Sequence, residues 1–103
     1  MSSGSPASEA KSGVCLVVTF PSVHQALKCE AAMVETGRKA KVMPVPRQIS
    51  SSCGLAVQVR WSLADPLEAA KAAAGEMERA RVDYETVHAD LGGRFELMLE
   101  AGA

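Results

Sequence analysis

The chain has 103 residues, of which 48% are hydrophobic and 4% are aromatic, and its formal net charge at pH 7 is −1. This length suits one domain, and the balanced charge argues against a large basic surface for nucleic acid or an anionic membrane. No apolar run is long enough to span a bilayer, and the N-terminus lacks the apolar segment of a secretory signal. We therefore expect one cytoplasmic domain with a core of Val, Leu, Ala and Met.

The first half of the chain predicts a tail, a strand, a helix and an edge strand. Residues 1–12 are rich in Ser, Gly, Pro and charge, which is typical of a disordered tail. Residues 14–20 are a continuous β-rich run. Residues 23–36 have helical spacing, with Ser22 as N-cap and Gly37 as C-cap. Pro44 within the next strand, 41–45, predicts an edge position. The helix is expected to bury one side, with Glu30 near its middle and the apolar members Val23, Ala26, Leu27, Ala31, Met33 and Val34.

The second half predicts two or three strands and one helix. Residues 55–61 alternate as a third strand, and the Asp65-Pro66 pair starts a helix that ends near residue 80. Residues 82–89 predict a fourth strand, and Gly92-Gly93 predicts a turn to a fifth at 94–99. The second helix is expected to turn inward the residues Leu67, Ala70, Ala73, Ala74 and Met77. We assign 13–90 to the domain and 91–103 to a C-terminal extension.

The element order predicts the fold class. A β-α-β-β-α-β order indicates an α+β protein with the ferredoxin-like split βαβ sandwich, in which two helices cover one face of an antiparallel sheet in the strand order 4-1-3-2. In that topology the turn after the first strand and the loop after the second meet at one edge of the sheet. We therefore expect His24 to lie near Arg47 and Cys53.

The loop at 46–54, PRQISSSCG, is unusual because it concentrates polar and reactive residues between two apolar runs. A cysteine reacts as its thiolate, which positive charge and backbone N–H donors favour. Arg47 offers a permanent cation, His24 a base or a second cation, and Gly54 a backbone free to approach a ligand. Hydroxyl donors come from Ser50, Ser51 and Ser52. Cys53 is accordingly the candidate reactive thiol.

Two other interpretations remain open. Arg47, the serines and the Gly54 amide could bind a small anion or a partner's carboxylate without covalent chemistry. Alternatively, Cys29 could resolve an oxidised Cys53, although the helix leads away from the loop. Cys15 and Cys29 are otherwise expected in or near the core. Glu30 is expected either to be a half-buried carboxylate that meets a loop amide or Arg47, or to be an exposed residue at the edge of the apolar side, and a structural role is favoured over a binding role. No CxxC pair or metal-binding spacing occurs, so we expect no metal and no cofactor.

Three segments resemble the small bacterial domain family known as putative selenium/sulfur carrier-like. The first is F-x-S-x-H-x-A-L at 20–27, and the second is Glu30 on the helix that follows. The third and most specific is P-x-P-R-x-I-S-S-x-C-G at 44–54. The resemblance covers roughly residues 14–90. Cys29 stands where the family commonly has alanine, and 91–103 extends beyond the usual length.

The resemblance implies a covalent carrier more than a turnover enzyme. It implies that Cys53 carries sulfur or selenium as a persulfide or perselenide, with Arg47 and the serines around it. In the carrier hypothesis we also expect His24 to assist proton movement. The expected partners are a donor protein, such as a cysteine desulfurase, and an acceptor protein. No nucleic-acid or membrane partner is expected.

Overall fold

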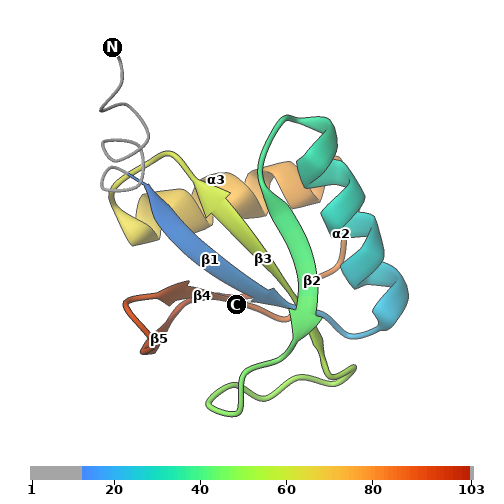
Figure 1. Ribbon diagram of the computed structural model, residues 1–103. Coiled ribbons are helices and arrows are strands. Elements are labelled where there is room, and N and C mark those ends of the chain that lie inside the picture. The colour runs from blue at the N-terminus through green and yellow to red at the C-terminus, as the bar shows by residue number, and fades with distance from the viewer. Residues whose placement is uncertain (1–12, 103) are drawn as a thin grey trace.

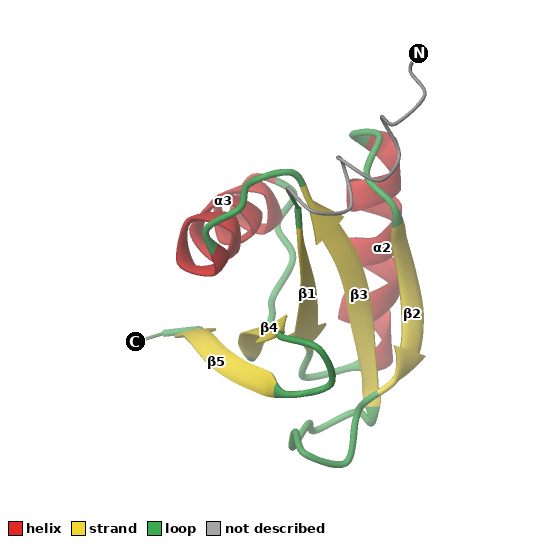
Figure 2. Cartoon of the chain, turned by 60° about the vertical axis from the view of Figure 1, so that its left-hand side comes forward, coloured by secondary structure: helices red, strands yellow, loops and turns green. Residues whose placement is uncertain are grey.

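The computed structural model describes residues 13–102, so the predicted tail at 1–12 lies outside the described residues. Within residues 13–102, a five-stranded antiparallel sheet carries two helices, α2 (Val23–Glu35) and α3 (Pro66–Arg79), and both cover the same face (Figures 1 and 2). Neither helix is long and apolar enough to cross a bilayer. The strands are β1 (Val14–Thr19), β2 (Ala40–Pro44), β3 (Leu55–Trp61), β4 (Thr86–Asp90) and β5 (Phe95–Glu100).

The sheet has the order β2-β3-β1-β4-β5, and every neighbouring pair is antiparallel. The first four strands reproduce the predicted 4-1-3-2 order and give the ferredoxin-like pattern. β2 occupies one edge, as Pro44 predicts, and β5 occupies the other through its pairing with β4. The fourth strand begins later than expected, because Val82 closes the helix end through a hydrogen bond to Met77 O (2.8 Å) and residues 82–85 form the connection.

The helix ends form as the sequence predicts. Ser22 is the N-cap of α2 and accepts a hydrogen bond from Gln25 N at 3.4 Å. Asp65 caps α3 by accepting from Leu67 N at 3.1 Å, with Pro66 in the first helical position. After α2, Gly37 adopts φ +86°, a left-handed conformation that glycine reaches without steric cost.

The inward face of each helix agrees only in part with the prediction, which is confirmed for Ala26 and Met33 in α2 and for Ala70, Ala73 and Met77 in α3. In α2 the buried residues are Ala26, Cys29 and Met33, whereas Val23, Leu27 and Val34 are 45–54% exposed. Ala31 is exposed as well. The helix packs on the sheet through the small side chains of Ala26 and Cys29 and through Met33, and Glu30 beside them is half-buried. In α3, Ala69 is buried with Ala70, Ala73 and Met77, while Leu67 is exposed and Ala74 half-buried.

The core lies between the helices and one face of the sheet. Alternate residues of the central strands enter it, with Leu16, Val18 and Phe20 from the β1 segment fully buried. The opposite face of the sheet carries a smaller cluster of three buried residues, Val17, Ile49 and Ala56. Ile49 comes from the loop between β2 and β3, so this loop covers part of the face that has no helix.

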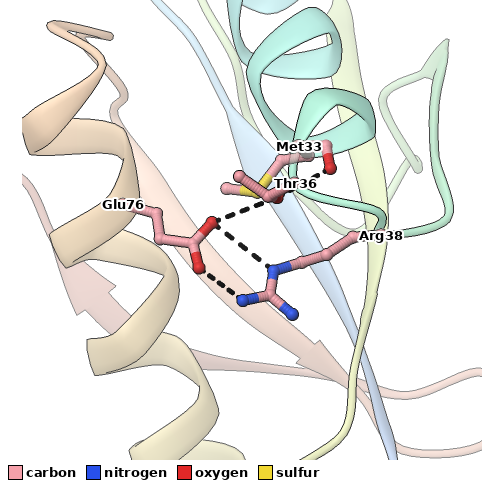
Figure 3. Close-up of polar contacts among 4 residues, drawn as sticks. All are labelled: Met33, Thr36, Arg38 and Glu76. Atoms are coloured by element: carbon pink, nitrogen blue, oxygen red, sulfur yellow. Dashed lines mark hydrogen bonds and ion pairs between the residues drawn. The ribbon is translucent and has the colours of Figure 1, made fainter.

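A polar contact joins the two helices near the C-terminal end of α2 (Figure 3). The Glu76 carboxylate of α3 pairs with the Arg38 guanidinium and lies 3.5 Å from Thr36 Oγ1. The Arg38 guanidinium also lies 3.7 Å from the centroid of the Trp61 ring. This contact fixes the relative positions of α2, α3 and the end of β3.

Candidate functional site

Residues 45–54, here called the thiol loop, connect β2 to β3 and project beyond the end of these strands (Figures 1 and 2). The turn from β1 into α2 lies at the same end of the sheet, as the topology predicts. A hydrogen bond from Ser51 Oγ to Phe20 O (3.4 Å) links the two segments directly. The fold therefore brings the Cys53 loop to the start of α2.

Ile49 anchors the first part of the thiol loop. Its side chain is 7% exposed and packs on Val17 and Ala56 of the sheet. Its amide donates to Pro46 O at 3.0 Å, which closes a turn at the entrance of the loop. At the other end, Val45 N donates to Gly54 O at 3.1 Å and continues the β2–β3 pairing. The loop is thus fixed by apolar packing and by backbone hydrogen bonds.

Cys53 is half-buried at the edge of the main core, where it packs against the core cluster. Its Sγ lies 3.4 Å from Leu55 N and 3.4 Å from Leu55 O. A thiol donates to the carbonyl, whereas a thiolate accepts from the N–H, which is a type of donor that stabilises sulfur anions. Gly54 has φ +78°, and nothing lies within 4 Å of the position a Cβ would take. The backbone conformation, and not lack of space, therefore favours glycine beside the thiol.

Two serines of the thiol loop, Ser51 and Ser52, hold the loop in place. Ser51 uses its hydroxyl on Phe20 O, as above. Ser52 donates from its amide to Glu85 Oε1 at 3.2 Å, and its hydroxyl bonds to Glu85 Oε2. Ser50 is exposed. In this arrangement the hydroxyls of Ser51 and Ser52 are directed at protein groups and not at the sulfur.

Glu85 contacts the thiol loop, although the sequence pattern did not indicate it as a site residue. It lies in the connection from α3 to β4, and its amide donates to Thr19 O at 2.7 Å. The start of β4 lies beside the end of β1, because Thr86 pairs with Thr19. The antiparallel pairing of β1 and β4 places this connection at the end of the sheet that also carries the β1–α2 turn and the thiol loop. Because residues 82–89 were all predicted to form a strand, the position of Glu85 in this connection was not predicted.

The remaining candidates occupy different positions. Arg47 and His24 are exposed, and neither side chain makes a hydrogen bond or ion pair within residues 13–102. Glu30 lies away from the thiol loop: its Oε2 accepts from Val42 N of the edge strand at 3.3 Å. Glu30 therefore satisfies a backbone donor at the open edge of the sheet, which is a structural role. Its partner is a strand amide and neither a loop amide nor Arg47.

The other two cysteines differ from Cys53 in their surroundings, and all three are free. Cys29 is fully buried, and this burial raises the pKa of its thiol to about 12. Burial, with a further contribution from Asp90, raises the pKa of the Cys15 thiol. Cys15 lines an open groove of about 680 Å³ with Lys41 and Arg60, at the opposite end of the sheet from the thiol loop. Both thiols are therefore less easily ionised than an ordinary cysteine.

A comparison with known protein families identifies one match. No curated protein and no solved structure matches the chain. The family model described as putative Se/S carrier protein-like matches residues 15–89, which include β1 from Cys15, α2, the complete thiol loop and β4 up to Ala89. The match spans well over half of the chain, and β5 lies beyond it. The chain therefore belongs to the putative Se/S carrier protein-like family.

Proposed function

We propose that this protein carries sulfur or selenium covalently on Cys53 and passes it to an acceptor protein. The proposal rests on the position of Cys53, which is half-buried in the thiol loop and lies beside the Leu55 N–H. The membership of the chain in the Se/S carrier-like family supports it. The two thiols outside this loop have raised pKa values, which makes them poorer nucleophiles at neutral pH.

The transfer needs no outside oxidant or reductant. A donor protein presents a cysteine persulfide, and the Cys53 thiolate attacks its outer sulfur. The donor's S–S bond breaks, its thiolate leaves and takes up a proton, and the persulfide now resides on Cys53. In the second half, an acceptor thiolate attacks the same outer sulfur and Cys53 leaves as a thiolate. Selenium in place of the outer sulfur follows the same steps.

Several features of the loop support this proposal. The Leu55 N–H can donate to the anionic form of the sulfur at Cys53. Arg47 in the thiol loop and His24 in the first turn of α2 are exposed, so both side chains are accessible to an approaching partner. In the proposal, Arg47 supplies positive charge and His24 assists proton movement.

The proposal is tested with the cyanide-labile sulfur assay after incubation with cysteine and a cysteine desulfurase. We expect close to one labile sulfur per chain for the unaltered protein and none for Cys53→Ser. Cys15→Ser is the matched control and should load normally. Equal loading of Cys53→Ser and the unaltered protein would refute the assignment of the carrier thiol.

The alternative is a non-covalent module that binds an anion or a partner's carboxylate through Arg47. The exposure of Arg47, whose guanidinium makes no hydrogen bond or ion pair with another of residues 13–102, favours it. The two functions differ in the effect of Arg47→Gln compared with Cys53→Ser on binding of an isolated desulfurase. A binding module loses affinity for the desulfurase with Arg47→Gln and keeps it with Cys53→Ser. A carrier loses all sulfur uptake with Cys53→Ser, whereas Arg47→Gln only slows its uptake.

A further inference from the structure

We propose that Glu85 is a positioning residue for Cys53, acting through Ser52. The role of Cys53 as a carrier thiol rests on the proposed function, but the positioning of the thiol loop by Glu85 can be tested separately. Glu85 belongs neither to the thiol loop nor to the motif at 44–54. It comes from the connection between α3 and β4, which the topology places at the same end of the sheet.

The Glu85 carboxylate binds the residue that immediately precedes Cys53 with both of its oxygens. Oε1 accepts from Ser52 N at 3.2 Å, and Oε2 bonds to the Ser52 hydroxyl. Hydrogen bonds to an ionised carboxylate are stronger and more directional than those between neutral groups. The paired contact therefore fixes both the position and the orientation of the Ser52 peptide.

Glu85 is itself fixed by the sheet. Its amide donates to Thr19 O at 2.7 Å, and the next residue, Thr86, pairs with Thr19 through both backbone and hydroxyl contacts. The backbone of Glu85 is thus anchored to the end of β1. Loops positioned by such a scaffold are well suited to presenting a reacting group.

Cys53 lies between two attachment points. Ser52 is bound to Glu85 on its N-terminal side, and Gly54 O accepts from Val45 N on its C-terminal side at 3.1 Å. Loss of the Glu85 contact would leave the segment before the thiol attached mainly through Ser51 and Ile49. The Sγ atom would then leave its contact with the core and with Leu55 more often.

The experiment compares Glu85→Ala, Glu85→Gln and Ser52→Ala with Glu96→Ala, an exposed glutamate on β5 that serves as control. Backbone hydrogen exchange of the loop peptide and iodoacetamide labelling of Cys53, located by peptide mapping, are measured on the full chain. For Glu85→Ala we expect exchange in the loop to be about tenfold faster, which is the effect of losing hydrogen bonds to a charged group. Labelling should also be faster, because the thiol leaves the core edge.

Glu85→Gln retains an acceptor for Ser52 N and a donor for its hydroxyl, so exchange should return to within about threefold of the unaltered protein. Ser52→Ala removes one of the two contacts and should give an intermediate increase. If the protein is a carrier, Glu85→Ala also takes sulfur from the desulfurase more slowly although its thiol is labelled faster. If sulfur uptake becomes slower while iodoacetamide labelling becomes faster, the Cys53 thiol has lost its position and not its accessibility.

The proposal is overturned if Glu85→Ala matches Glu96→Ala in loop exchange and in labelling. It is equally overturned if Glu85→Gln behaves as Glu85→Ala, since the hydrogen bonds would then not be the cause. An unaltered protein that takes up no sulfur would instead refute the carrier function. In that case the exchange and labelling results still decide whether Glu85 positions the loop.

Discussion

Replacing Ile49 by alanine is expected to loosen the thiol loop and to lower the free energy of unfolding. The Ile49 side chain is 7% exposed and packs with Val17 and Ala56, with Phe95 of β5 in contact with the same cluster. Removing such a side chain from a core costs about 2–5 kcal/mol. Because the loop borders solvent and can partly collapse, we expect a loss near the lower end, about 2 kcal/mol.

The assay is urea unfolding with linear extrapolation. A loss of about 2 kcal/mol lowers the urea midpoint by about 1–2 M for a slope of 1–2 kcal/mol/M, which is usual for a small domain. Ile49→Val retains most of the side chain and should cost about 1 kcal/mol. Val34→Ala, at a residue that is 54% exposed, serves as control and should stay within about 0.5 kcal/mol of the unaltered protein.

The result that would refute this reasoning is a cost for Ile49→Ala no larger than that of Val34→Ala. Ile49 would then not be docked on the sheet, and the thiol loop would lack its apolar anchor. A cost near 2 kcal/mol with an unchanged slope would instead indicate that the loop is part of the cooperative fold.

The remaining predictions concern stability and thiol reactivity. Glu30→Ala should lower the free energy of unfolding by about 1 kcal/mol in urea, because Val42 N loses its carboxylate partner, and Glu30→Gln should cost less. Glu76→Ala removes the partner of the Arg38 guanidinium and should cost about 1–2 kcal/mol in the same assay; no measurable change would show that the ion pair does not hold the helices. Because burial raises the pKa of Cys29 to about 12, its thiol stays protonated at pH 8, and iodoacetamide should label it only after denaturation.

Hydrophobic patterning and turn residues predicted most of the fold. The β-rich runs gave β1 and β3, the caps gave both helix starts, and Pro44 placed β2 at an edge. Patterning did not predict which side of α2 is buried, because apolar residues extend around much of the helix. The side that packs on the sheet carries Ala26, Cys29 and Met33, and Leu27 is exposed.

The sequence identified the thiol loop but not how it is held. The motif drew attention to Cys53 and Arg47, whereas the contacts that fix the loop involve Ile49 and Glu85. Ile49 looked like one apolar residue in a polar loop, and only the folded chain shows the face on which it lies. Glu85 is distant in sequence from the loop, and its contact with Ser52 depends on where β4 begins.

Intact-mass analysis after incubation with cysteine and a cysteine desulfurase, followed by peptide mapping, tests the central claim most directly. The carrier function predicts a gain of about one sulfur atom per chain, reversed by a reductant and located on Cys53. A protein that remains unmodified, and whose Cys53 is also slow to react with an alkylating agent, would contradict the carrier function and favour non-covalent binding through Arg47.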